Sequence, residues 1–153
     1  MEYLTNSPEE TKELGEKLAK KIKPGAKAAV ICLAGELGAG KTVFVQGFAK
    51  GLGVKEKILS PTFVIMNRFS VKKGEFKNFY HFDCYRLESE KDLSVLEFEN
   101  ILAGKQNIIC LEWPEKISKS FLECGTQIKF ESVNEKQRKI TIKQIRGKNG
   151  KEK

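Results

Sequence analysis

The chain has 153 residues, 40% of them hydrophobic, which predicts one globular domain with a single core and excludes a disordered chain. No run approaches the roughly 20 apolar residues that cross a bilayer. The N-terminus is polar and acidic, unlike a signal peptide, so we expect a cytoplasmic protein without membrane contact. The net charge of +8 would suit a polyanion, but Arg146–Lys153, with four basic residues and one acid, supplies +3 of it. We expect a domain over 1–146, a disordered basic tail over 147–153, and a solvated basic surface rather than direct RNA contact.

The predicted elements alternate between helices and strands at first and end in a hairpin. Ser7, Pro8 and Glu10 form an N-cap, a first-turn proline and a capping box, so a helix is predicted over 7–22. The apolar run over 28–34 indicates a strand that is covered on both faces. The later elements, in order, are a helix ending near Gly53, strands over 63–69 and 78–83, a helix from Ser89 to Gly104, a buried strand over 107–113, and a hairpin of strands over 126–132 and 139–145. This order predicts an α/β, three-layer fold of the P-loop NTPase type, whose mixed sheet has a parallel centre, antiparallel strands and a C-terminal hairpin.

A phosphate-binding loop is predicted between the first buried strand and the helix that follows it. The spacing Gly35-x-x-x-x-Gly40-Lys41-Thr42 matches the phosphate-loop pattern, and the strand before it and helix after it are the context that this pattern needs. Lys41 is expected to reach the β- and γ-phosphates, and the Thr42 hydroxyl to bind Mg²⁺. The residues whose backbone is expected to hold the nucleotide phosphates are Gly35, Glu36, Leu37, Gly38, Ala39 and Gly40.

Two acids end predicted strands where a metal-side carboxylate is needed. Glu112 follows the more continuous apolar run and is the first choice for the metal side, and Asp83 is the second candidate. His81, the only histidine, is interpreted as a structural residue or one that supports the site from behind. The segment Ser60–Thr62 is either a nucleotide-sensing segment or an ordinary turn. The cysteines have no metal-like spacing, and Cys32 and Cys110 are interpreted as small buried hydrophobes.

Four segments together are more specific than the loop alone. "GELGAGKT", "SPTF", "YHFDCYRL" and "LEWPE" come in the order and approximate spacing of the TsaE family, which the chain resembles over nearly its whole length. That family is the small bacterial ATPase of tRNA threonylcarbamoyladenosine synthesis. The resemblance implies an ATPase with one α/β domain that binds ATP and Mg²⁺. We expect the isolated chain to be a monomer that hydrolyses ATP slowly, because a domain of 153 residues leaves little surface for a second substrate pocket. It also implies the protein partners TsaB and TsaD, with tRNA engaged indirectly through the complex.

The same resemblance implies roles for single residues. Lys41 and Thr42 match the positions that hold phosphates and metal, Glu112 the Mg²⁺ ligand, and Asp83 the acid of "HFD". Further matches are Ser60 and Thr62 on a switch-like segment, Trp113 on the family tryptophan, and Lys136 or Arg138 on the base side of the nucleotide, of which Arg138 is taken as the binding residue. Relatives often carry glycine where this chain has Glu97, so the local packing of the predicted helix there is expected to differ.

Two other classes share part of this pattern. A small-molecule kinase would use the same loop, but it needs an acceptor pocket that is usually lined by several arginines, and the chain has only Arg68, Arg86, Arg138 and Arg146. A basic RNA-binding module would use the positive charge, but the sequence has no aromatic-rich RNA motif. The sequence therefore favours an accessory ATPase.

Overall fold

The strands of the chain form one mixed sheet of seven strands. The computed structural model describes residues 1–36, 38–58, 65–72, 74–85, 87–89, 91–116 and 125–145. The sheet order is β1-β7-β6-β2-β5-β4-β3. The strands are β1 (Glu2–Thr5), β2 (Ala29–Ala34), β3 (Met66–Ser70), β4 (Asn78–Asp83), β5 (Asn107–Glu112), β6 (Gly125–Ser132) and β7 (Arg138–Ile145). The helices are α1 (Pro8–Lys21), α2 (Lys41–Gly51), α3 (Lys91–Val95), α4 (Phe98–Ala103) and the short 3₁₀ helix η1 (Pro114–Lys116).

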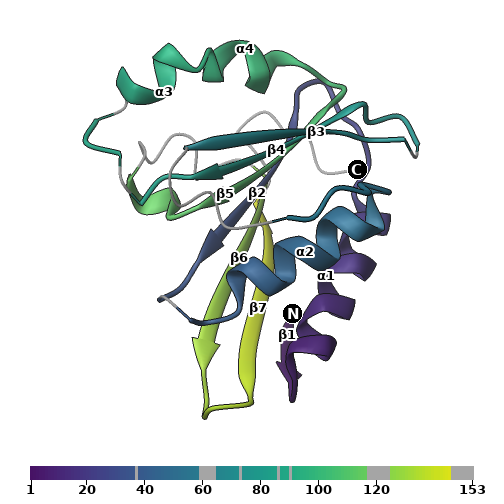
Figure 1. Ribbon diagram of the computed structural model, residues 1–153, viewed down its shortest axis with the longest axis vertical. Helices are drawn as coiled ribbons and strands as arrows, with labels where there is room; N and C mark the ends of the chain where they lie inside the picture. Colours follow the sequence, from purple (N-terminus) through teal and green to yellow (C-terminus); the bar gives the residue numbers. More distant parts are fainter. Residues whose placement is uncertain are drawn as a thin grey trace.

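The centre of the sheet is parallel and its outer strands are antiparallel. β2 lies between β5 and β6 and runs parallel to both, and β4 runs parallel to β5. The remaining pairs, β3 with β4, β6 with β7 and β1 with β7, are antiparallel. Helices α1 and α2 pack on one face, and α3 and α4 on the other (Figure 1). The predicted fold class is therefore confirmed.

Side chains on both faces of the central strands make the core. All six residues of β5 are buried, as expected for a strand that is covered by helices on both sides. On β2, Ile31 and Leu33 face the cluster that includes α2, whereas Cys32 faces the cluster that includes Phe98 of α4. The apolar run of β2 is explained by this double coverage.

Helix α1 holds α2 against the sheet through a close contact of small residues. The N-cap Ser7 accepts a hydrogen bond from the backbone N–H of Glu10 at 3.1 Å, so α1 begins as predicted. A Cβ atom at Gly47 would lie 1.8 Å from the carbonyl oxygen of Lys12, so only glycine permits this approach. At the start of α1, the hydroxyls of Thr5 and Thr11 are 2.7 Å apart and buried, which ties β1 to the helix.

Two elements differ from the sequence predictions. Strand β1 was not predicted; it is only four residues long and gains its ladder from β7 at the other end of the chain. The single helix predicted from Ser89 to Gly104 is wrong, because the structure has two short helices, α3 and α4, in this range. Glu97 separates them with φ 57° and ψ 37°, a left-handed conformation that ends the first helical run and caps the second. No helix in the described ranges has the length and hydropathy of a membrane span.

We predict that Glu97→Gly stabilises the protein. An exposed glutamate in the left-handed region costs about 1–2 kcal/mol, and the larger unfolded-state entropy of glycine offsets about 0.5–1 kcal/mol of the gain. The free energy of unfolding, measured in urea, should therefore rise by roughly 0.5–1 kcal/mol. The matched control is Glu13→Gly at an exposed site inside α1, which should lower it by about 1 kcal/mol. Equal destabilisation by both changes would contradict the assignment.

Candidate functional site

The loop between β2 and α2 has the geometry that phosphate binding requires. Gly35, Gly38 and Gly40 all have positive φ, and Gly40, at φ 98°, is the N-cap of α2. A side chain would be strained in this conformation, so Gly40 lets the chain turn directly into the helix. The N–H of Ala39 donates to the carbonyl of Glu36 at 3.1 Å, which closes a turn within the loop. The N-terminus of α2, where a helix dipole favours an anion, therefore lies at this loop.

The parallel centre of the sheet brings both predicted acids to this loop. Glu112 ends β5 beside Leu33 of β2, and Asp83 ends β4 directly opposite Glu112. Because parallel strands end at the same edge of a sheet, these carboxylates meet where β2 enters the loop. A pocket of about 230 Å³ lies there, and its walls include Gly38, Lys41, Thr42, Asp83, Glu112 and Trp113.

Lys41 lines the pocket, and its ammonium contacts two uncharged partners. Its Nζ donates to the carbonyl oxygen of Gly35 at 2.5 Å and lies 3.9 Å from the centroid of the Trp113 ring. Burial lowers the pKa of Lys41, and the negative charges of Glu112, Glu115 and Asp83 oppose that shift. A phosphate oxygen entering this space would meet a largely desolvated cation, whose attraction for anions is stronger than at the surface.

The two acids have different surroundings. One oxygen of Asp83 accepts a hydrogen bond from the backbone N–H of Tyr85 at 3.0 Å. Burial raises the pKa of Asp83 and this hydrogen bond opposes the shift, while the nearby Glu112 charge raises it further. Glu112 is only 4% exposed, and its Oε2 lies 2.6 Å from Nε2 of His81, a residue of β4 that is fully buried. The His81 contact was not specified by the sequence, where only a supporting role had been assigned.

A smaller pocket of about 130 Å³ adjoins the loop on the side of α1. Arg138 donates from Nη2 to the carbonyl oxygen of Gly38 at 3.2 Å, and its Nη1 donates to the carbonyls of Asn134 and Gln137. Ser7, the N-cap of α1, and Thr11 of α1 line this pocket. The sequence motifs give no reason to place either residue here, since their pattern indicates only a helix start.

The comparisons with known proteins identify the family. A family profile described as "Threonylcarbamoyl adenosine biosynthesis protein TsaE" matches residues 5–140. The chain belongs to the TsaE family. The "tRNA threonylcarbamoyladenosine biosynthesis protein TsaE" of Bacillus subtilis is 35% identical over 143 residues, covering 93% of this chain and 84% of that protein. The protein of the same description from Aquifex aeolicus is 35% identical, with 92% and 94% coverage. The crystal structure of Bacillus subtilis YdiB superposes with a TM-score of 0.66 at 30% identity, covering 93% of this chain and 83% of that one.

Seven of the predicted site residues line one pocket, and three lie outside the described part of the chain. Gly38, Gly40, Lys41, Thr42, Asp83, Glu112 and Trp113 line the pocket at the sheet edge. Leu37, Ser60 and Thr62 fall outside the ranges that the structure describes.

Burial raises the pKa of both Cys32 and Cys84 to about 12, as expected for thiols that act as small hydrophobes.

The donor set in this TsaE-family site suits Mg²⁺. Nowhere in the described ranges do three His, Cys, Asp or Glu side chains converge as a metal site. Mg²⁺, however, commonly binds through one or two carboxylates and completes its shell with phosphate oxygens and water. The Thr42 hydroxyl and the carboxylates of Glu112 and Asp83 face one pocket and provide such a set.

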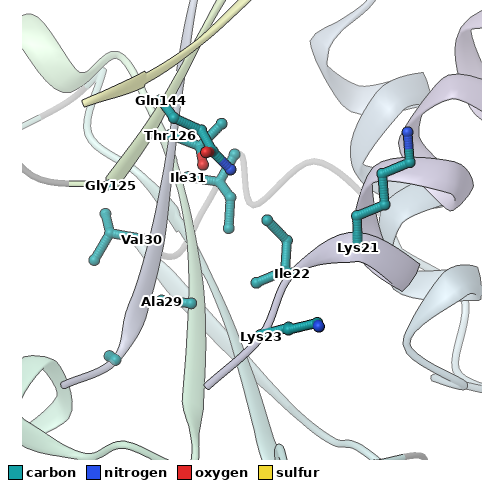
Figure 2. Close-up of a pocket in the computed structure, with 10 residues that line it drawn as sticks. Lys21, Ile22, Lys23, Ala29, Val30, Ile31, Gly125, Thr126 and Gln144 are labelled. Atoms are coloured by element: carbon teal, nitrogen blue, oxygen red, sulfur yellow. The ribbon is translucent and has the colours of Figure 1, made fainter. Parts of the chain in front are cut away.

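Another pocket, of about 400 Å³, lies at the opposite end of the central strands. It is lined by the start of β2, by Gly125 and Thr126 of β6, and by the end of α1 (Figure 2). The Ile22 side chain points towards β2, whereas the ammonium of Lys21 points away from that strand (Figure 2). Ligands of open α/β sheets bind at the carboxyl ends of the strands, so the pocket at the loop is the candidate site of this TsaE-family chain.

We predict that Trp113 fluorescence reports occupation of the loop. Trp113 is the only tryptophan, and its ring touches the Lys41 ammonium. A polyphosphate that binds Lys41 draws the cation off the ring, so its titration should change the emission in a saturable way. Inorganic tripolyphosphate and ATP are the probes, and Lys41→Met should abolish the change. The control Lys50→Met, at an exposed lysine at the other end of α2, should preserve it. Constant emission while calorimetry detects binding would contradict the prediction.

Proposed function

We propose that the chain binds ATP with Mg²⁺ at the loop between β2 and α2 and hydrolyses it. The observation that carries the proposal is the meeting of Lys41, Thr42, Asp83 and Glu112 in one pocket at the carboxyl edge of the parallel strands. Phosphoryl transfer mainly needs positioned reactants and compensation of developing negative charge. A cation, a hydroxyl and two carboxylates around a loop of inward N–H groups are the groups that supply both.

The proposed roles follow from the contacts of each side chain. Lys41 exchanges its bond to the Gly35 carbonyl for the β- and γ-phosphate oxygens, because it can donate three hydrogen bonds. The hydroxyl of Thr42 and the carboxylate of Glu112 hold the metal side. Asp83, which keeps one oxygen on the N–H of Tyr85, orients the attacking water. When bound there, Mg²⁺ would compensate negative charge on the phosphates. Arg138, which contacts Gly38, is proposed to lie on the base side of the nucleotide.

We place this ATPase in the formation of threonylcarbamoyladenosine in tRNA, as an accessory protein in the cytoplasm. The family and the relatives carry the name of that pathway. The proposed partners are TsaB and TsaD, and tRNA is engaged through the complex. Trp113 supports a link between nucleotide and partner, because its ring contacts both the Lys41 ammonium and, at a centroid distance of 5.0 Å, the ring of the exposed Tyr85. The isolated monomer is proposed to turn over slowly until a partner orders the site.

Lys41→Ala should lower ATP hydrolysis by at least a hundredfold. Removing one group that stabilises developing charge typically costs 10²–10³ in turnover, and Lys41 is the cation in this pocket. The measurement is phosphate release with ATP and Mg²⁺ and no other acceptor. Lys50→Ala, at an exposed lysine on the same helix, is the control and should keep the parental rate.

The same assay separates the ATPase from a kinase. An ATPase releases phosphate with water as the acceptor, whereas a small-molecule kinase needs a second substrate. If Lys41→Ala hydrolyses ATP at the parental rate, the loop between β2 and α2 is not the site of hydrolysis. Phosphate release that stays undetectable with and without partners would remove the assignment of hydrolysis.

ATP should tighten association of the chain with a TsaB–TsaD pair more than ADP does. A ligand shifts an equilibrium only by its different affinity for two states, so tighter partner binding with ATP implies tighter ATP binding with partner. The expected difference is roughly 5–150-fold, the usual range of such coupling. Titration of the pair by calorimetry with ATP, ADP and no nucleotide measures it.

Trp113→Ala is the variant that isolates this coupling. It should reduce the difference in partner affinity between the ATP-bound and ADP-bound chain more than it reduces ATP affinity. It should also reduce tRNA modification over many turnovers more than ATP affinity. Val95→Ala, at an exposed site away from the loop, is the control and should leave the difference intact. Equal association under all three nucleotide conditions would leave an ATPase without a switching role.

A further inference from the structure

The buried pair of His81 and Glu112 lies directly behind the pocket. His81 is on β4 and fully buried, and its ring stacks with Phe79 at a centroid separation of 6.5 Å. Its Nε2 approaches Oε2 of Glu112, on the neighbouring strand, at 2.6 Å. His81 itself is not among the pocket walls, whereas Glu112 is. The histidine therefore touches the pocket only through the carboxylate.

The surroundings of the ring determine where its proton lies. An ionised carboxylate only accepts hydrogen bonds, so the contact requires a proton on Nε2. The other nitrogen, Nδ1, is buried and has no hydrogen-bond partner within the described ranges. The contact with Glu112 therefore places a proton on Nε2 of His81.

This bond restricts what Glu112 can present to the pocket. One carboxylate oxygen is engaged by His81, so the side chain cannot rotate without breaking a buried hydrogen bond. Within the described part of the chain, no hydrogen bond to the other oxygen, Oε1, is found. That oxygen is on the same carboxylate that lines the pocket with Lys41 and Thr42.

We propose that His81 is a positioning residue: its Nε2–H holds one oxygen of Glu112 so that the other is presented to Mg²⁺ beside Thr42. The inference rests on the proposed Mg²⁺ role of Glu112. Partners that hold a metal-ligating carboxylate from behind typically contribute 10–100-fold to metal affinity. His81 is not itself a ligand, because it does not line the pocket.

The first test is the tautomer of His81. The chain has one histidine, so ¹⁵N side-chain NMR of the untagged protein gives a single imidazole. The expected spectrum shows a protonated Nε2. A proton on Nδ1 with none on Nε2 would overturn the proposal, because Nε2 would then have no proton to donate to Glu112.

The second test is metal affinity, measured by the EPR signal of free Mn²⁺ in the presence of ADP. His81→Phe keeps a ring but removes the donor, and it should weaken Mn²⁺ binding roughly 10–100-fold. His81→Gln carries an amide N–H near the position of Nε2 and should restore affinity close to that of the parent. Binding of ADP without metal should be unchanged in both. Thermal unfolding checks that each variant is folded.

A second matched pair keeps the polarity of the site if the phenylalanine variant fails to fold. His81→Asn places its amide near the position of Nδ1, too short to reach Glu112, so it should bind Mn²⁺ as weakly as His81→Phe while His81→Gln binds tightly. A folded Phe or Asn variant with parental Mn²⁺ affinity would overturn the positioning role alone. If the parent itself binds no Mn²⁺ with nucleotide, the proposed metal role of Glu112 fails, and the positioning role fails with it.

Discussion

Parallel pairing at the centre of the sheet is the constraint on which the site depends. β5 lies between β2 and β4 and runs in the same direction as both, so the three strands end together. The loop leaves one strand, Glu112 ends the next and Asp83 ends the third. An antiparallel β5 would place its acid at the far edge of the sheet. The proposed catalytic arrangement therefore depends on the direction of the strands as well as on the side chains at their ends.

That geometry places charged groups in a region with little water, and contacts with neighbouring groups offset part of the cost of burying them. Lys41 is 5% exposed and Glu112 is 4% exposed. Burying an isolated charge is very costly, whereas charges of opposite sign with hydrogen-bond partners offset much of that cost. The carbonyl of Gly35, the ring of Trp113 and the imidazole of His81 are those partners. Removing one of these partners leaves the buried charge of Lys41 or Glu112 less well compensated.

The sequence was sufficient for features that depend on local pattern. Apolar runs predicted the parallel centre, and the acids at their ends predicted which carboxylates meet the loop. Features that depend on distant partners were not predictable. Strand β1 exists because β7 pairs with it, and the His81–Glu112 bond depends on the register of two strands. The break at Glu97 was not predicted, because the apolar pattern of a helix does not show that one residue adopts a left-handed conformation. The proposed roles of Ser60 and Thr62 remain predictions, since both lie outside the described residues.

The position of β2 also governs the order in which the chain can assemble. Both neighbours of β2, β5 and β6, come from the second half of the chain, and the N-terminal ammonium bonds to the carbonyl of Ile142 across 141 residues. A ribosome must therefore deliver most of the protein before the strand that carries the loop gains either ladder. Until then its apolar edges are open to pairing with other chains. The topology that brings the two acids together also means that long-range contacts dominate folding, which slows folding. A newly made chain is therefore exposed to aggregation for longer.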